Sequence, residues 1–166
     1  IFEDSGGNLW IGTLTQGVDV LDRSRKHMRH YNMRTPDALH ASYIPAFMED
    51  SDGNLWIGTG YGIDVLEKKS GKITHYLNDL NDAGSLSNNS VLSLYEDSRG
   101  WIWIATHGGL NLYDKHTGKF SAFTKDDGLP HNSILTILED DNRNLWVSTP
   151  HGLSNLKIAF RPGARD

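Results

Sequence analysis

The sequence contains no cysteine, and this absence excludes disulfide bridges and thiolate metal sites. It also lacks a basic patch: 16 lysines and arginines are scattered among 21 acidic residues, which argues against a nucleic-acid surface. No apolar run approaches the roughly 20 residues that a membrane-spanning helix needs. The chain opens with IFED, without a methionine or a basic leader, so we expect no signal peptide here. Contact with a membrane is expected only through a longer parent chain.

A sustained helical pattern of apolar residues is missing as well. The apolar runs are instead five to seven residues long, rich in β-branched and aromatic residues, and bounded by Gly, Asn, Asp or Ser. This composition is typical of β-strands joined by hairpins. We therefore expect an all-β protein with almost no helix.

What the 166 residues do contain is one unit written four times. NLWIGT at 8–13 recurs letter for letter at 54–59, and the related strings WIWIAT and NLWVST stand at 101–106 and 144–149. The aligned tryptophans, 46, 47 and 43 residues apart, are Trp10, Trp56, Trp103 and Trp146. An apolar run ending in Glu-Asp and a polar turn precede each tryptophan, and further strand-like segments follow it. A period of about 45 residues with four strands per unit is typical of a β-propeller blade.

We predict one partial β-propeller of four-stranded antiparallel blades. The predicted units are about 1–42, 43–88, 89–132 and 133–160, with a tail at 161–166. The first unit lacks most of its first strand and the fourth has no clear last strand, which leaves about 14 strands, or about three and a half blades. The chain is therefore expected to be a piece of a longer protein. The remainder of that propeller, or a second copy, is expected to cover the end blades.

The tryptophan strand predicts how the blades stack. The residue two positions after each tryptophan is always small, and these residues are Gly12, Gly58, Ala105 and Ser148. Because side chains alternate along a strand, Trp56 and Gly58 should face one neighbouring blade, and Leu55 and Ile57 the other. A large indole beside a small residue forms a knob and a dent. We therefore interpret these four tryptophans as packing elements rather than as a sugar-stacking platform.

The variable segments predict where a ligand binds. In a propeller, the turns between second and third strands and the linkers between blades emerge on one face, here called the rim. The turn segments 14–16, 60–61, 107–108 and 150–151 vary between units, and so do the linkers. Variation on a constant scaffold is where specificity usually resides. The ligand-contact candidates are Gln16, His40, Tyr43, Tyr61, Asn88, His107, His131 and His151. Asn89 and Asn132 are favoured as loop caps.

Catalytic and metal chemistry find less support. The rim histidines have no fixed ligand spacing, so no metal site is predicted. The paired acids, such as Glu49–Asp50, recur at every first hairpin, which favours capping of the turn over catalysis. We predict no catalytic residue and no cofactor. Two alternatives stay open: a propeller lyase or hydrolase that uses a His-rich rim as acid and base, and a pure protein-interaction scaffold.

The string ED-S-x-G-N-L-W-I-G-T, followed by Gly-hydrophobic, LD and TGKF, closely resembles the two-component regulator propeller repeat, over about residues 1–158. The segments 82–97 and 126–140 resemble that family's connections between blades. The resemblance implies the periplasmic sensor region of a hybrid histidine kinase of Bacteroides-type bacteria, anchored in the inner membrane by its parent chain. Members of the family sense breakdown products of polysaccharides. The resemblance thus implies a non-catalytic sensor segment that detects an oligosaccharide or another small polar ligand, or that forms dimer contacts.

Overall fold

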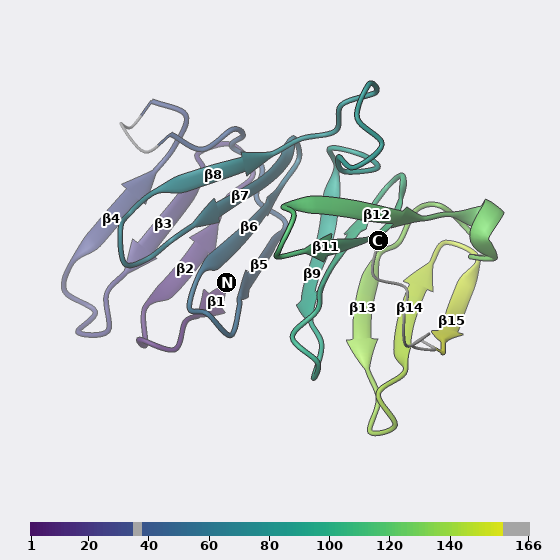
Figure 1. Cartoon of the computed structure of the whole chain (residues 1–166). Helices are drawn as coiled ribbons and strands as arrows, with labels where there is room; N and C mark the ends of the chain where they lie inside the picture. Colours follow the sequence, from purple (N-terminus) through teal and green to yellow (C-terminus); the bar gives the residue numbers. More distant parts are fainter. Residues whose placement is uncertain (35–37, 158–166) are drawn as a thin grey trace.

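The computed structural model describes residues 1–34 and 38–157, and within them it forms 15 β-strands and one short 3-10 turn, Lys125–Asp127 (Figure 1). The predicted all-β class is therefore confirmed. The expected tail at 161–166 lies outside the described residues.

The strands form four antiparallel sheets in chain order. Blade 1 contains β1 (Phe2–Glu3), β2 (Leu9–Gly12), β3 (Val18–Leu21) and β4 (Met28–Tyr31). Blade 2 contains β5 (Ala46–Glu49), β6 (Leu55–Thr59), β7 (Gly62–Leu66) and β8 (Ile73–Tyr76). Blade 3 contains β9 (Val91–Glu96), β10 (Ile102–Thr106), β11 (Gly109–Asp114) and β12 (Lys119–Phe123). Blade 4 contains β13 (Thr136–Glu139), β14 (Leu145–Thr149) and β15 (Gly152–Leu156).

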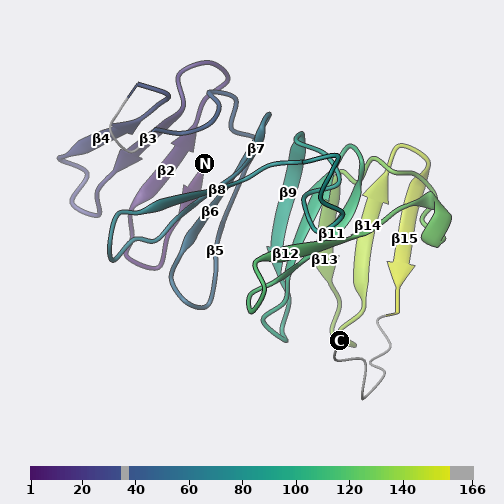
Figure 2. The same ribbon diagram turned by 45° about the horizontal axis from the view of Figure 1, so that its top comes forward.

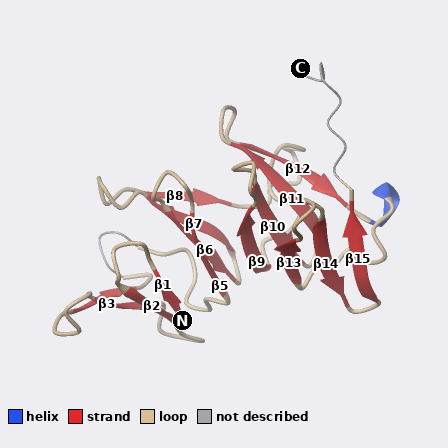
Figure 3. Cartoon of the chain, turned by 90° about the horizontal axis from the view of Figure 1, so that it is seen from below, coloured by secondary structure: helices blue, strands red, loops and turns tan. Residues whose placement is uncertain are grey.

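The four sheets follow one another side by side along the molecule, as Figures 2 and 3 show from two further directions. The first strands of blades 2, 3 and 4 lie next to one another, since β9 contacts both β5 and β13. This arrangement is a partial β-propeller. The structure has one strand more than the roughly 14 expected from four-stranded units, because the first strand of blade 1 is present as the two-residue β1.

The tryptophan strands pack as predicted. Trp56 lies in one cluster with Leu94, Ile102 and Ile104 of blade 3. Leu55 and Ile57 belong instead to a cluster with Trp10 of blade 1. Side-chain alternation on β6 therefore supplies both faces of blade 2 with apolar contacts.

The small residue after each tryptophan makes room for the next blade. A Cβ atom at Gly58 would lie 2.8 Å from Cγ1 of Val91, the first residue of β9. A Cβ atom at Gly12 would lie 2.9 Å from Cβ of Ile44, just before β5. A larger side chain at either position would push the following blade away. The knob-and-dent interpretation is confirmed at both sites.

Burial of the tryptophans depends on the presence of the following blade. The side chains of Trp10, Trp56 and Trp103 are 3%, 2% and 3% exposed, whereas Trp146 in blade 4 is 36% exposed. The tryptophan of the motif is thus buried where a following blade covers it and half-exposed in blade 4. Trp101, which replaces the turn asparagine of the other units, is half-buried.

The tight turns require left-handed backbone at two residues other than glycine. The sequence pattern assigns these positions to Arg143 and Lys26, because glycine occupies them in other units. The structure confirms Arg143, with a φ of 61°, but places the second at Arg25, with a φ of 60°. The hairpin after β3 is one residue offset from the alignment, so the prediction for Lys26 is wrong.

Candidate functional site

Backbone hydrogen bonds hold the rim together by interleaving the turns with the linkers. The N–H of Ile44, in the linker before blade 2, donates to the carbonyl of Thr13 at 3.1 Å. The N–H of His107 donates to the carbonyl of Ser90 at 3.2 Å, and that of Ile134 to the carbonyl of Thr106 at 3.0 Å. The variable turns and linkers therefore share one face, as predicted.

Three of the predicted residues meet where blades 3 and 4 join. Nδ1 of His107 lies 2.8 Å from Oγ of the buried Ser133. The backbone N–H of Ser133 donates to Nδ1 of His131 at 2.9 Å, which leaves the proton of a neutral His131 on Nε2. The ring of His131 packs edge-on against His151, with centroids 4.8 Å apart. We call His107, Ser133, His131 and His151 the histidine row.

The histidine row is suited to binding polar groups. His107 and His151 are exposed, whereas Ser133 is buried and fixes the two neighbouring imidazoles. Among the described residues, none of the three histidines forms an ion pair with a carboxylate. A serine beside a histidine without an orienting acid lacks the third member of a hydrolytic triad. The row offers hydrogen-bond donors and acceptors on a fixed backbone.

Two further candidates lie at the rim of blade 2. Tyr43 and Tyr61 are 44% and 53% exposed. The N–H of Gly60 donates to the carbonyl of Tyr43 at 3.0 Å, and a Cβ atom at Gly60 would lie 3.0 Å from the Tyr43 ring. Glycine thus lets the ring rest on the turn that carries Tyr61. In blade 1, Gln16 occupies the corresponding turn and lines a polar pocket together with Arg34.

The amide candidates serve the loops themselves. Oδ1 of Asn88 accepts the N–H of Ser90 at 2.8 Å. Oδ1 of Asn89 accepts the N–H of Asn78 at 2.6 Å, and Oδ1 of Asn132 accepts the N–H of Lys125 at 2.8 Å. These contacts agree with loop capping for Asn89 and Asn132, and they give Asn88 the same role.

His40 contacts neither the tyrosines nor the histidine row in any described interaction. Its backbone N–H donates to Oδ2 of the buried Asp64 at 2.8 Å, and its ring packs 3.9 Å from that of His75, centroid to centroid. Asp64 and His75 were not anticipated. The pairing depends on the register of β7 and β8, which the sequence pattern does not specify.

The paired acids at the opposite face have two separate structural roles. The Asp of each pair accepts the indole N–H of the tryptophan six residues later, as at Trp56 Nε1 and Asp50 Oδ2, 2.8 Å apart. It also accepts the N–H of Asn54, which confirms turn capping. The Glu instead reaches the preceding blade: Glu96 accepts the N–H and the Oγ–H of Ser51 at 2.6 and 2.7 Å. Equivalent contacts join Ser5 to Glu49 and Ser98 to Glu139.

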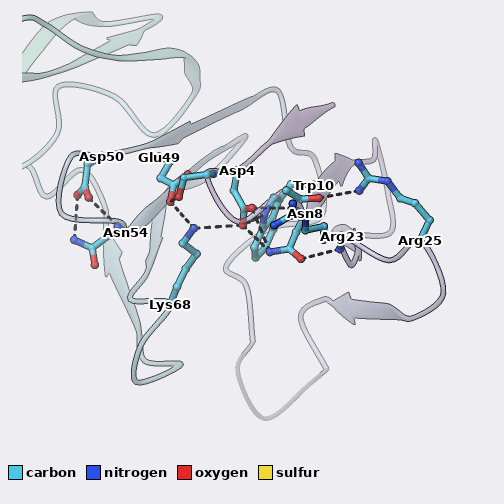
Figure 4. A network of polar contacts seen from close by, with 11 residues as sticks. Asp4, Asn8, Trp10, Arg23, Arg25, Glu49, Asp50, Asn54 and Lys68 are labelled. Carbon is cyan, nitrogen blue, oxygen red and sulfur yellow. Dashed lines mark hydrogen bonds and ion pairs between the residues drawn. The ribbon is translucent and has the colours of Figure 1, made fainter.

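This glutamate–serine clasp was missed by sequence reasoning, although the repeated ED-S string carried its signal. A lysine strengthens it between blades 1 and 2, where Nζ of Lys68 contacts both Glu49 and Asp4 (Figure 4). Burial raises the pKa of Asp4, but hydrogen bonds from Asn8, Trp10 and Lys68 outweigh it and lower the pKa to about 2. These contacts join neighbouring blades at the opposite face.

Comparison with known proteins agrees with the repeat pattern. Residues 38–61, 85–108 and 128–151 match the model of the two-component regulator propeller family. Each match covers the last part of one linker, the hairpin after it and the following turn. A comparison with curated protein sequences finds no match.

Solved structures give a longer match. The chain is similar to the extracellular domain of a hybrid two-component system from B. thetaiotaomicron, with 31% identity and a TM-score of 0.80, over 93% of this chain and 20% of that one. It is also similar to the extracellular domain of a one-component system from the same organism, with 25% identity and a TM-score of 0.78, over 93% of this chain and 23% of that one. The chain therefore spans about a fifth of these relatives. Virginiamycin B lyase from Staphylococcus aureus, at 15% identity, a TM-score of 0.67 and coverage of 96% and 55%, shares the fold alone.

The part of the chain that the structure describes has no helix with the length and hydrophobicity needed to cross a bilayer.

Proposed function

Because this chain is built from repeats of the two-component regulator propeller family, we propose that it is a non-catalytic sensor segment in the extracellular region of a two-component signalling protein. The proposal is supported by similarity to the extracellular domains of a hybrid two-component system and of a one-component system, each across 93% of the chain. In a bacterium with two membranes, such a segment faces the periplasm. Its parent chain supplies the membrane anchor and the signalling output.

The rim is the ligand-binding face in this proposal. It presents the exposed rings of Tyr43 and Tyr61 and the imidazoles of the histidine row, which lie on the turns and linkers of this face. Aromatic faces pack against the apolar face of a sugar ring, and imidazoles and amides hydrogen-bond its hydroxyls. The ligand class that fits is an oligosaccharide or another small polar molecule. The histidine row is the observation that carries this assignment, because hydrogen bonds to Ser133 and ring packing hold its imidazoles in place.

Blade 4 presents the surface that completes the segment. Leu138, Trp146 and Leu153 are 61%, 36% and 66% exposed, and Leu138 pairs with Trp146 across β13 and β14. In blades 1 to 3 the corresponding tryptophan is covered by the next blade. The fitting partner for this surface is therefore a further blade, supplied by the remainder of the parent propeller or by a second copy of the chain.

Calorimetry on the complete extracellular region tests the rim assignment. Titration with a panel of oligosaccharides identifies the ligand, and Tyr61→Ala, His107→Ala and His151→Ala should each weaken its binding by about tenfold, or about 1.4 kcal/mol. These side chains are exposed, so the melting temperature should change little. His116→Ala is the matched control, since His116 is exposed in the β11–β12 hairpin on the opposite face. Unchanged affinity in all three rim variants would refute the rim assignment, and consumption of the ligand would favour the lyase or hydrolase alternative.

A further inference from the structure

Two histidines converge on one buried carboxylate in blade 2. The side chain of Asp64 is completely buried, and Oδ1 lies 2.7 Å from Nδ1 of His75 and 3.5 Å from Nδ1 of His40. The His40 and His75 side chains are 34% and 33% exposed, so the cluster lies beneath the surface but open to solvent. One ligand atom from each residue lies within 4.8 Å of the other two.

When both histidines are neutral, no positive charge among the described residues balances the buried carboxylate of Asp64. In the described part of the chain, the two imidazoles are the only ion-pair partners of Asp64. A buried carboxylate is normally paired with a cation or bound to a metal. At 3.5 Å, His40 Nδ1 is also too far from Oδ1 for a good hydrogen bond. A divalent cation between the three side chains would supply the missing positive charge and engage His40.

Blade 3 shows that the histidines are not needed to hold the linker. At the equivalent positions it has Asn111, Ser87 and Ala122, and Asn111 pairs with Ala122 as Asp64 pairs with His75. Oδ1 of Asn111 accepts the N–H of Ser87 at 2.9 Å, and its Nδ2 donates to Oγ of Ser87 at 3.0 Å. A neutral amide therefore ties the linker to the third strand. Blade 2 instead has one aspartate and two histidines at these positions, and all three can bind a metal. Tying the linker to the third strand does not require this set.

We propose that His40, Asp64 and His75 form a binding site for a divalent cation of the zinc class. Two imidazoles and one carboxylate are a known ligand set for zinc, with the fourth position open to water or to a ligand. Tetrahedral geometry with bonds of about 2.0–2.2 Å separates neighbouring ligand atoms by roughly 3.3 Å. The His40–Asp64 distance of 3.5 Å already suits this geometry.

The His75–Asp64 distance of 2.7 Å is that of a hydrogen bond, so cation binding requires the proton to leave Nδ1 of His75, for Nε2 or for solvent, and the His75 ring to shift slightly outward. β8 is the outermost strand of blade 2 and the His75 side chain is about one-third exposed, so the ring has solvent on one side to shift into. The bound cation would clamp the linker that carries Tyr43 onto β7 and β8. The site consists of the linker before blade 2 and two strands of that blade, and it does not depend on the sensor role.

Metal titration of the full chain tests the site. The protein is stripped with a chelator and titrated with Zn²⁺ by calorimetry, and with Co²⁺, whose visible absorption reports nitrogen ligation. We expect one cation per chain and a rise in melting temperature on binding. His40→Gln and His75→Gln should each weaken the affinity at least about tenfold, since even outer-shell substitutions commonly cost that much.

Asp64→Asn should also abolish tight binding while leaving the metal-free melting temperature nearly unchanged, because Asn111 occupies this position in blade 3. His30→Gln is the matched control: His30 pairs with Asp19 in the same register of blade 1, at 2.5 Å. A second control, His151→Gln, tests the histidine row. The proposal is overturned by the absence of stoichiometric binding, or by an affinity that survives both His40→Gln and His75→Gln. Equal loss in His30→Gln would overturn it as well.

Discussion

Trp56 and Trp146 share one motif but differ in their neighbours, and replacing each with alanine separates the contribution of blade stacking. Trp56 is 2% exposed, and its indole N–H donates to Asp50 at 2.8 Å. Its ring centroid lies 6.2 Å from that of Tyr76 and 5.0 Å from that of Tyr113. Trp146 makes the same hydrogen bond, to Asp140 at 2.9 Å, but is 36% exposed.

The difference in burial sets the expected magnitudes. Truncation of a buried tryptophan to alanine costs about 3–5 kcal/mol, because burial is lost and a cavity remains. The lost hydrogen bond to the buried Asp50 places Trp56→Ala in the upper part of that range. Trp146 keeps about two-thirds of full burial, and water fills the space left on its open side, so Trp146→Ala should cost about 2 kcal/mol.

Urea denaturation followed by far-ultraviolet circular dichroism measures both losses without depending on tryptophan fluorescence. The Trp56→Ala loss should exceed the Trp146→Ala loss by at least about 1 kcal/mol. Equal losses would show that the following blade contributes nothing to the burial energy. A loss below about 1 kcal/mol for Trp56→Ala would show that the indoles are not packing elements.

Three further predictions concern the contacts between blades. Glu96→Gln should cost about 1–2 kcal/mol of unfolding free energy, because a glutamine oxygen cannot replace both carboxylate contacts to Ser51. A loss below about 0.5 kcal/mol by urea denaturation would show that the clasp does not stabilise the fold. The folded-state pKa of Asp4, about 2, lies below its usual 3.8, so its stabilisation is present above about pH 4 and lost as the pH falls towards 2. Asp4→Asn should reduce the fall in melting temperature over that window, and an unchanged acid profile would contradict this. Leu138→Glu should reduce self-association of the chain in sedimentation experiments, whereas a wild-type monomer at high micromolar concentration would mean that the face around Trp146 needs no partner.

The blade architecture could be predicted because the same packing pattern recurs in every repeat of the sequence. The four tryptophan motifs and the small residue Gly58 predicted which strand packs between blades, which side chains lie on each of its faces and which blade covers them. The structure places Val91 of blade 3 against Gly58, as expected. The glutamate–serine clasp is equally repeated, yet it joins residues 41 to 45 positions apart in adjacent units. Its presence follows only once the stacking of blades is known.

The candidate site could be predicted only in part, because it depends on single residues rather than on the repeat. Loop variability located the rim. His107 and His131 meet there through Ser133, which the sequence pattern did not single out, and His151 packs on His131. His40 was grouped with them, but it lies against Asp64 and His75. That cluster joins Asp64 to a linker histidine 24 residues before it and to a strand histidine 11 residues after it. Within the described residues, no other blade repeats it with two histidines.

Hydrogen–deuterium exchange on the complete extracellular region, with and without its ligand, tests the assignment of the rim most directly. Ligand binding should slow amide exchange in the turns 59–62, 106–109 and 149–152 and in the linkers packed against them. The hairpins of the opposite face, at 50–54 and 97–101, should exchange at unchanged rates, because clasp and capping contacts already occupy them. Protection confined to those hairpins, or no protection in this chain when the ligand is bound, would contradict a sensor segment that reads its ligand at the rim.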